Sequence, residues 1–132
     1  MASIDQTTVL KNLNAFTPEV INTDTKTDGL EIDTIGFESI TFFMRSTSYA
    51  DGAFTPLIQG TNTSGTGYVD ITNDFLIGTE DGAALDADKV SKIGVVASYR
   101  FYKLSFVSTG TTTGSLLDAV AVLGSPRRAA VA

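Results

Sequence analysis

Short stretches in which apolar and polar residues alternate recur along this chain, separated by turns rich in glycine, aspartate and threonine. In the clearest stretch, residues 93–114, Tyr102, Leu104 and Phe106 share one face while Lys103 points to the other. A period of two is typical of a half-buried β-strand. The stretch predicts the arm of a hairpin with a polar end, and the other segments of the chain are compared with it.

Other segments repeat this pattern less strongly. Residues 37–45 place Ile40, Phe42 and Met44 on one face, which we expect to be core. Pro56, within residues 54–59, indicates a sheet edge because proline cannot donate to a β-ladder. Shorter strand candidates are residues 19–23, 29–33, 68–71, 75–77 and 115–123, with a turn at 27–29 and a short helical turn within 79–92.

About eight to ten short strands without long amphipathic helices predict an all-β fold. We expect a single-domain antiparallel β-sandwich, jelly-roll-like, with terminal arms. The predicted divisions are an N-terminal arm over residues 1–17, the sandwich over 18–124 and a C-terminal tail over 125–132.

The N-terminal segment has two interpretations. Val9, Leu13 and Phe16 have the spacing of one face of a short amphipathic helix, which Pro18 would end. Such an arm would dock on a neighbouring subunit, because its apolar stripe must be buried. A frayed terminus or a first strand is the alternative.

Composition removes several classes of chemistry. The 132 residues include no cysteine and no histidine, which excludes disulfides, thiolate metal sites and serine triads of the usual form. The start is not basic, and no stretch approaches the roughly 20 apolar residues of a membrane span. We therefore expect a soluble protein without a recognisable export signal. It should be no enzyme and have no metal, cofactor or membrane partner.

Charge is distributed unevenly along the chain. Residues 1–88 carry fourteen acids against three bases, a net charge of −11, and residues 89–132 carry six bases against Asp118, a net charge of +5. The total of −6 disfavours nucleic acid, because phosphate neutralisation dominates that affinity. Arg127 and Arg128 alone are a weak nucleic-acid signal.

Three patterns that could carry chemistry have simpler interpretations. Residues 24–29 begin like a calcium loop but have Ile35 where a bidentate carboxylate is needed. The glycine-rich residues 60–67 lead into a strand rather than a helix, so they do not form a phosphate loop. The paired carboxylates at 80–81 and 86–88 lie in a small-residue segment that suggests exposure. A sugar-stacking platform would need the aromatic residues Tyr49, Tyr68, Tyr99, Tyr102, Phe101 and Phe43.

Four segments together carry a family resemblance. They are DTIGFESITFFMRS, DGAFTPLIQG, KIGVVASYRFYKLSFVSTGTTTG and AVLGSPRR, within residues 33–128. In their order along the chain and their residue patterns, these segments resemble small virion proteins of tailed bacteriophages. Those proteins are encoded near the major capsid protein and are regarded as head decoration or cement proteins. The resemblance includes no catalytic motif.

This resemblance implies a structural role on the outer surface of the capsid, with assembly in the host cytoplasm. The implied partners are the major capsid protein and further copies of the chain, with a trimer as one expectation. The alternative is a phage tail or adhesin module that binds host-surface glycans. Candidate interface residues are Val9, Leu13, Phe16, Tyr99, Arg100, Phe101, Lys103, Arg127 and Arg128.

Two expectations concern particular interface segments. The tail, residues 125–132, would contact an acidic capsid or neighbouring-subunit surface through Arg127 and Arg128; two solvated arginines on a terminus are the alternative. Tyr99, Arg100, Phe101 and Lys103 combine apolar area with positive charge, which is common at interfaces. We expect another subunit to cover part of this second set.

Overall fold

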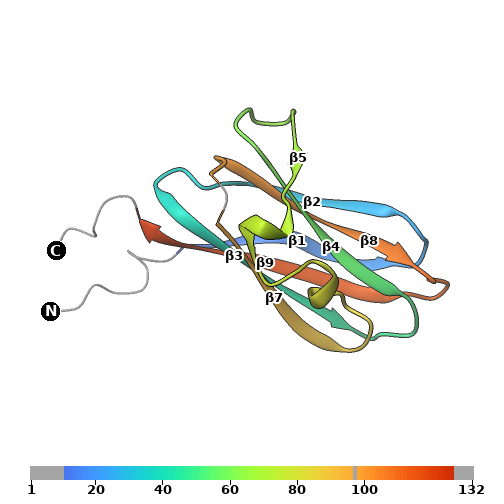
Figure 1. The fold of residues 1–132 in the computed structure, drawn as a ribbon. Helices are drawn as coiled ribbons and strands as arrows, with labels where there is room; N and C mark the ends of the chain where they lie inside the picture. The colour runs from blue at the N-terminus through green and yellow to red at the C-terminus, as the bar shows by residue number, and fades with distance from the viewer. Residues whose placement is uncertain (1–10, 97, 127–132) are drawn as a thin grey trace, which may run out of the picture.

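The computed structural model describes residues 11–96 and 98–126, which form nine strands and two short 3₁₀ turns. The strands pack as two antiparallel sheets (Figure 1). The elements are β1 (Lys11–Ile21), β2 (Lys26–Asp33), β3 (Phe37–Thr47), β4 (Ala53–Thr61), β5 (Val69–Asp70), η1 (Asn73–Phe75), β6 (Leu76–Ile77), η2 (Asp81–Ala83), β7 (Lys89–Val95), β8 (Phe101–Thr109) and β9 (Ser115–Pro126).

The strand order is that of a jelly roll. Sheet A has the order β1-β9-β3-β7-β6, and sheet B has the order β2-β8-β4-β5. The pairs are nested: β1 lies beside β9, β2 beside β8, β3 beside β7 and β4 beside β5. This is the pattern of one long hairpin rolled over itself, so the predicted jelly-roll sandwich is confirmed.

The predicted hairpin over residues 93–114 is wrong. β7 belongs to sheet A and β8 to sheet B, and the described residues between these strands, 96 and 98–100, are here called the crossover. Ile93 and Leu104 are fully buried, and they enter the core from opposite sheets. Alternation identified which side chains face inward, but it carries no information about which sheet presents them.

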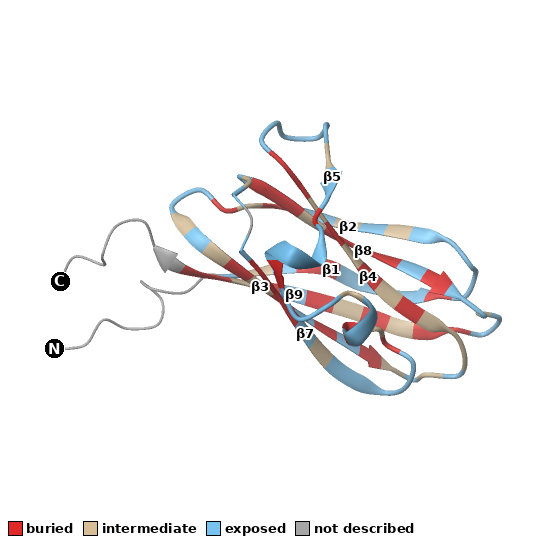
Figure 2. Ribbon diagram, in the orientation of Figure 1, coloured by how far each residue is buried: buried red, intermediate tan, exposed pale blue. Residues whose placement is uncertain are grey.

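The core lies between the inner faces of the two sheets (Figure 2). Ile40, Phe42 and Met44 are buried there, as predicted. Tyr102, Leu104 and Phe106 face them from sheet B, also as predicted. Large fully buried side chains contribute most of the hydrophobic stabilisation, at about 25 cal/mol for each Å² of apolar area removed from water.

The sandwich extends beyond the predicted limits of residues 18–124. β1 begins at Lys11 and pairs with β9, so the first-strand alternative is confirmed for residues 11–17 and the helical interpretation is wrong for them. Phe16 packs edge to face on Phe106, with ring centroids 5.0 Å apart, which fixes this strand to the core. β9 continues to Pro126, two residues beyond the predicted domain limit.

The predicted turn at residues 27–29 lies inside β2, where the register with β8 shifts between Asp28 and Glu31. Gly29 explains this irregularity. A Cβ at Gly29 would lie 2.2 Å from the carbonyl oxygen of Leu104 and 2.5 Å from that of Ala15. The glycine therefore lets the edge of sheet B approach β1 of sheet A closely.

Pro56 lies where β4 is a free sheet edge, as predicted. β4 pairs with β5 only at Gln59 and Gly60. On either side of Pro56, Phe54 N donates to Leu85 O at 2.9 Å and Ile58 N donates to a Glu80 carboxylate oxygen at 2.6 Å. Both amides point away from β8. The nitrogen of Pro56, which carries no hydrogen, points the same way, and no strand lies beside β4 at that position.

Candidate interaction surfaces

One end of the sandwich brings together the two ends of the described chain. Lys11 lies opposite Leu123 in the pairing of β1 with β9, and Phe37 lies opposite Pro126 in the pairing of β3 with β9 (Figure 1). The segments 1–10 and 127–132 are therefore joined to the sandwich at the same end. The crossover and two surface hollows also lie there.

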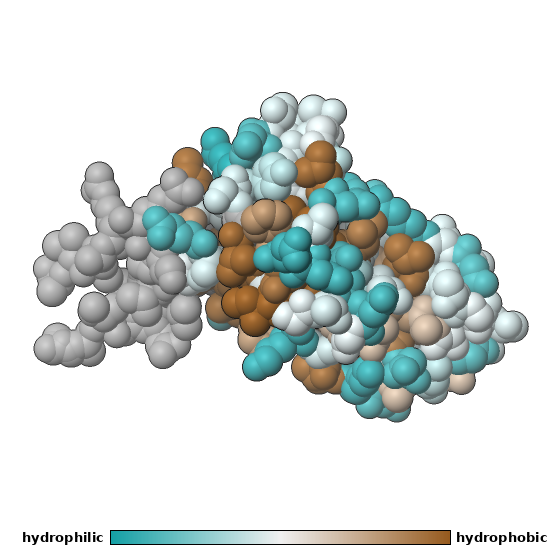
Figure 3. Space-filling model, viewed as in Figure 1, coloured by the Kyte–Doolittle hydropathy of each residue, from teal (hydrophilic) through white to brown (hydrophobic). Residues whose placement is uncertain are grey.

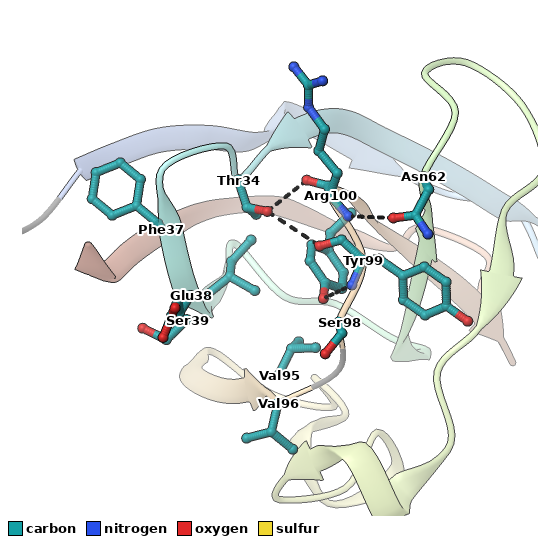
Figure 4. A pocket seen from close by; sticks show the side chains of 12 residues that line it. Thr34, Phe37, Glu38, Ser39, Asn62, Val95, Val96, Ser98, Tyr99 and Arg100 are labelled. Atoms are coloured by element: carbon teal, nitrogen blue, oxygen red, sulfur yellow. Dashed lines mark hydrogen bonds between the residues drawn. The ribbon is translucent and has the colours of Figure 1, made fainter. Parts of the chain in front are cut away.

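The first hollow is polar, with a volume of about 510 Å³, and β3 forms one wall while the crossover forms another. Hydrogen bonds hold its rim: Thr34 Oγ1 donates to Arg100 O at 2.7 Å, and Arg100 N donates to Asn62 Oδ1 at 3.1 Å. The Arg100 side chain points away from the hollow (Figure 4). The lining residues are Thr34, Phe37, Glu38, Ser39, Ile40, Asn62, Val95, Val96, Ser98, Tyr99, Arg100 and Tyr102.

The second hollow is apolar, with a volume of about 630 Å³, and Val96, Ser98 and Tyr99 line it as well as the first. Phe75 and Val96 are each about half exposed here. Apolar side chains gather at the surface over β6 and the neighbouring part of β7 (Figure 3). The other lining residues are Val69, Asp70, Ile71, Thr72 and Phe75. Exposed apolar side chains around a hollow are typical of a contact surface for another protein.

The structure separates the four predicted interface residues around β8. Tyr99 and Arg100 lie in the crossover, and Arg100 forms a two-bond ion pair with Asp33 at 3.0 and 2.9 Å. Lys103 is half-buried on the outer face of sheet B, with its Nζ 4.3 Å from the centroid of the Tyr68 ring. Phe101 is only 9% exposed. Its own chain covers it, so the reason for expecting another subunit over Phe101 falls away.

The predicted residues of the two ends have different positions. Phe16 is a core residue, and Leu13 is half-buried against the core, so neither belongs to a separate docking arm. The physical reason is the pairing of β1 with β9, which turns the apolar stripe of this segment inward. Val9, Arg127 and Arg128 lie outside the described residues.

A second surface, the outer face of sheet A, was not predicted. Its exposed apolar side chains come from all five strands, and we call them the apolar face: Val20, Phe43, Ile77, Val90 and Val120. The available signal was an apolar residue directly beside an inward-facing one, as in Phe43 beside Phe42 and Val120 beside Ala121.

Three of the paired carboxylates, Glu80, Asp86 and Asp88, have structural partners. The pKa of Glu80 is raised, mainly by burial, and its carboxylate accepts the hydrogen bond from Ile58 N at the edge of β4. Asp86 pairs with Lys89 at 2.9 Å, and Asp88 accepts from Tyr49 N at 2.8 Å. Glu80 is therefore less exposed than the sequence suggested.

The described tyrosines do not form one stacking platform. Tyr99 and Tyr102 pack edge to face with ring centroids 6.3 Å apart, and Tyr99 also lies against Gly60. The Tyr49 hydroxyl donates to Gly52 O at 2.6 Å, and the Tyr68 hydroxyl donates to Glu31. Phe43 lies on the outer face of sheet A, away from them.

Within residues 11–96 and 98–126, no group of three or more acidic side chains is placed to hold a metal ion. The helical elements in that part of the chain are two 3₁₀ turns of three residues, and neither approaches the length of a membrane-crossing helix.

Comparison with known proteins supports the fold. No protein-family model matches the chain, and no curated protein matches its sequence. Among solved structures, the chain is similar to the SPBc2 prophage-derived protein YomS, with a TM-score of 0.50 and 11% sequence identity. The match covers 88% of this chain and 93% of YomS. The sandwich therefore has a counterpart of nearly the same extent in a prophage-derived protein.

Proposed function

We propose that this protein is a structural component of a bacteriophage particle that binds the assembled head as a decoration or cement protein. The resemblance of four sequence segments to such proteins supports the proposal, and so does a fold shared with a prophage-derived protein. The partners are the major capsid protein and further copies of this chain, and the location is the outer surface of the capsid.

The observation that carries this proposal is the shared end of the sandwich. The described chain begins and ends there, at Lys11 and Pro126, beside the crossover and the two hollows. A protein that bridges capsid subunits gains contact area from terminal segments that dock beside a preformed surface. Exposed Phe75 and Val96 supply apolar area at the apolar hollow, and Arg127 and Arg128 follow directly after Pro126. We assign the head contact to this end.

The direct test is cosedimentation of the purified protein with mature and immature heads of its own phage. We expect saturable binding with a fixed number of copies per head. Removing residues 127–132 leaves β9 intact to Pro126 and should lower occupancy. Phe75→Lys should lower it further, because it places a charge beside the apolar hollow.

Val107→Lys, on the outer face of sheet B, is the matched control and should bind as the unaltered protein does. No binding to either form of head would overturn the proposed function. Equal loss with Phe75→Lys and Val107→Lys would overturn the assignment to this end. Saturable binding on a glycan array without head binding would favour the adhesin alternative.

A further inference from the structure

Exposed apolar side chains on the outer face of sheet A come from every strand of the sheet and lie in cross-strand rows with polar residues such as Asn14 and Lys92. Phe43 lies between Lys92 of β7 and Val120 of β9, and Ile77 of β6 covers Gly94. Val20 of β1 pairs with Leu116 near the other edge. The apolar face therefore crosses the whole sheet rather than forming isolated exposed positions.

One ion pair lies in the middle of this face. Arg45 of β3 and Asp118 of β9 are directly opposite in the ladder, joined by Nε to Oδ1 at 3.1 Å and Nη2 to Oδ2 at 2.6 Å. Because each charge already has a partner in its own chain, covering the pair is less costly than covering a single charge.

We infer that the apolar face binds a second copy of this chain, with a two-fold axis that runs parallel to the strands between β3 and β9. This goes beyond the proposed contact with the head, because it needs no capsid and uses a different surface. Two sheets pack well at about 10 Å separation when apolar side chains interdigitate.

Charge complementarity favours a second copy and also fixes the axis. A rotation about a line between β3 and β9 places β9 of one copy over β3 of the other. Arg45 of each copy then lies over Asp118 of the other, and the four charges form a closed alternating ring. Lys92 of β7 lies over β1, where Asn14 is its counterpart, because Asn14 and Lys92 flank Val120 and Phe43 in one row. An axis perpendicular to the strands through the Arg45–Asp118 row would instead place Arg45 over Arg45 and Asp118 over Asp118, like charge on like charge.

The available area suits a reversible dimer. Five strands spaced about 4.8 Å apart, with four rows of outward side chains, give a face of roughly 500 Å² for each copy. About 1,000 Å² in total is at the lower end of specific interfaces. We therefore expect dimers that dissociate on dilution, and that become persistent when many copies are held close together on a shell.

The first experiment is sedimentation equilibrium of the full chain over a wide concentration range. We expect a monomer–dimer equilibrium. Val120→Lys should weaken dimerisation about tenfold or more, because it places an unpaired charge in the centre of the interface. Val107→Lys makes the same change on the outer face of sheet B, where the valine is similarly exposed, and should leave dimerisation unchanged. Circular dichroism confirms that both variants are folded.

The second experiment uses the charge ring. Arg45→Asp makes the four positions in a homodimer all acidic, and Asp118→Arg makes them all basic, so each variant alone should be monomeric. An equimolar mixture of the two should dimerise, because every charge then faces its opposite. A monomer at all concentrations for the unaltered protein, equal effects of the two lysine substitutions, or no association in the mixture would each overturn the inference.

Discussion

The outer faces of the two sheets differ in kind. On sheet B, polar side chains contact one another across the strands: Asp28 accepts from Ser105 at 3.0 Å and lies 3.3 Å from Lys26 and 3.6 Å from Lys103. On sheet A, exposed valines, Phe43 and Ile77 surround a single two-bond ion pair. The polar groups of the first face have partners within the same chain. The second leaves apolar side chains exposed, and it is the face to which we assign the second copy.

The polar network on sheet B also explains why Lys103, a predicted interface residue, contacts residues of its own chain. Glu31 accepts from Ser64 Oγ at 2.6 Å and from Gly65 N at 2.8 Å, and the Tyr68 hydroxyl donates to it as well. These bonds tie the loop after β4 to β2. Lys103 lies between this group and Asp28, so its charge already has partners. A cationic residue beside aromatic rings is thus not evidence of a free interface.

The largest expected loss of stability is at the close contact between β2 of sheet B and β1 of sheet A, which joins the two sheets. Gly29→Ala should cost about 3 kcal/mol of folding free energy, since its Cβ would meet two backbone carbonyl oxygens that cannot rotate away. Denaturant unfolding measures the loss. A substitution that leaves the unfolding midpoint unchanged would show that β2 can move away from β1.

Gly94→Ala is the matched control on sheet A. Its Cβ would lie 3.3 Å from the Cβ of Ile77, at the edge of the sheet, and the short strand β6 has room to adjust. We expect a cost of less than about 1 kcal/mol. A loss as large as that of Gly29→Ala would indicate that β6 is as firmly held as the β1–β2 contact.

The next effect concerns pH and the polar face. Hydrogen bonds from Ser64, Tyr68 and Gly65 lower the pKa of Glu31. A lowered pKa in the folded state adds stability above the unfolded value of 4.5, and this stability is lost as the pH falls through the folded pKa. Glu31→Gln should lower the Tm at pH 7 by roughly 2–5 °C and flatten its decrease between about pH 5 and pH 3.

Glu19→Gln, at an exposed position on β1, is the control for this measurement. It should leave the thermal unfolding profile nearly unchanged at every pH. If Glu31→Gln follows the unaltered protein through the acid range, the loop after β4 does not depend on that carboxylate.

Sequence alternation predicted the inner faces well and the outer faces poorly, for a physical reason. Burial of Ile40, Phe42 and Met44 follows from period two alone, because one sheet side must face the core. Whether Phe43 or Lys103 is exposed depends on which strands lie beside it, and this is a property of long-range pairing. Phe101 became buried for the same reason, since β2 and β4 flank it.

The hairpin prediction failed through the same missing information. A polar segment between two apolar stretches looks alike whether it turns within one sheet or crosses to the other. The position of Lys11 and Pro126 at the same end of the sandwich was also not predictable, because it depends on β1 and β3 both pairing with β9. The carboxylate at Glu80 became half-buried through its bond to the edge of β4, which adjacent small residues do not indicate.

The smallest structural change gives the sharpest comparison of the two faces. Arg45 and Arg100 each form a two-bond pair with an aspartate, one on sheet A and one beside sheet B. Both arginines are exposed, and exposed pairs add little stability, so Arg45→Gln and Arg100→Gln should each shift the Tm by less than about 2 °C. Their effects on self-association should differ. Arg45→Gln leaves Asp118 without its cation in the dimer and should weaken it several-fold, whereas Arg100→Gln should have no effect when both are measured by sedimentation. If both variants dimerise as the unaltered protein does, the charge ring does not contribute to association and only the apolar side chains do.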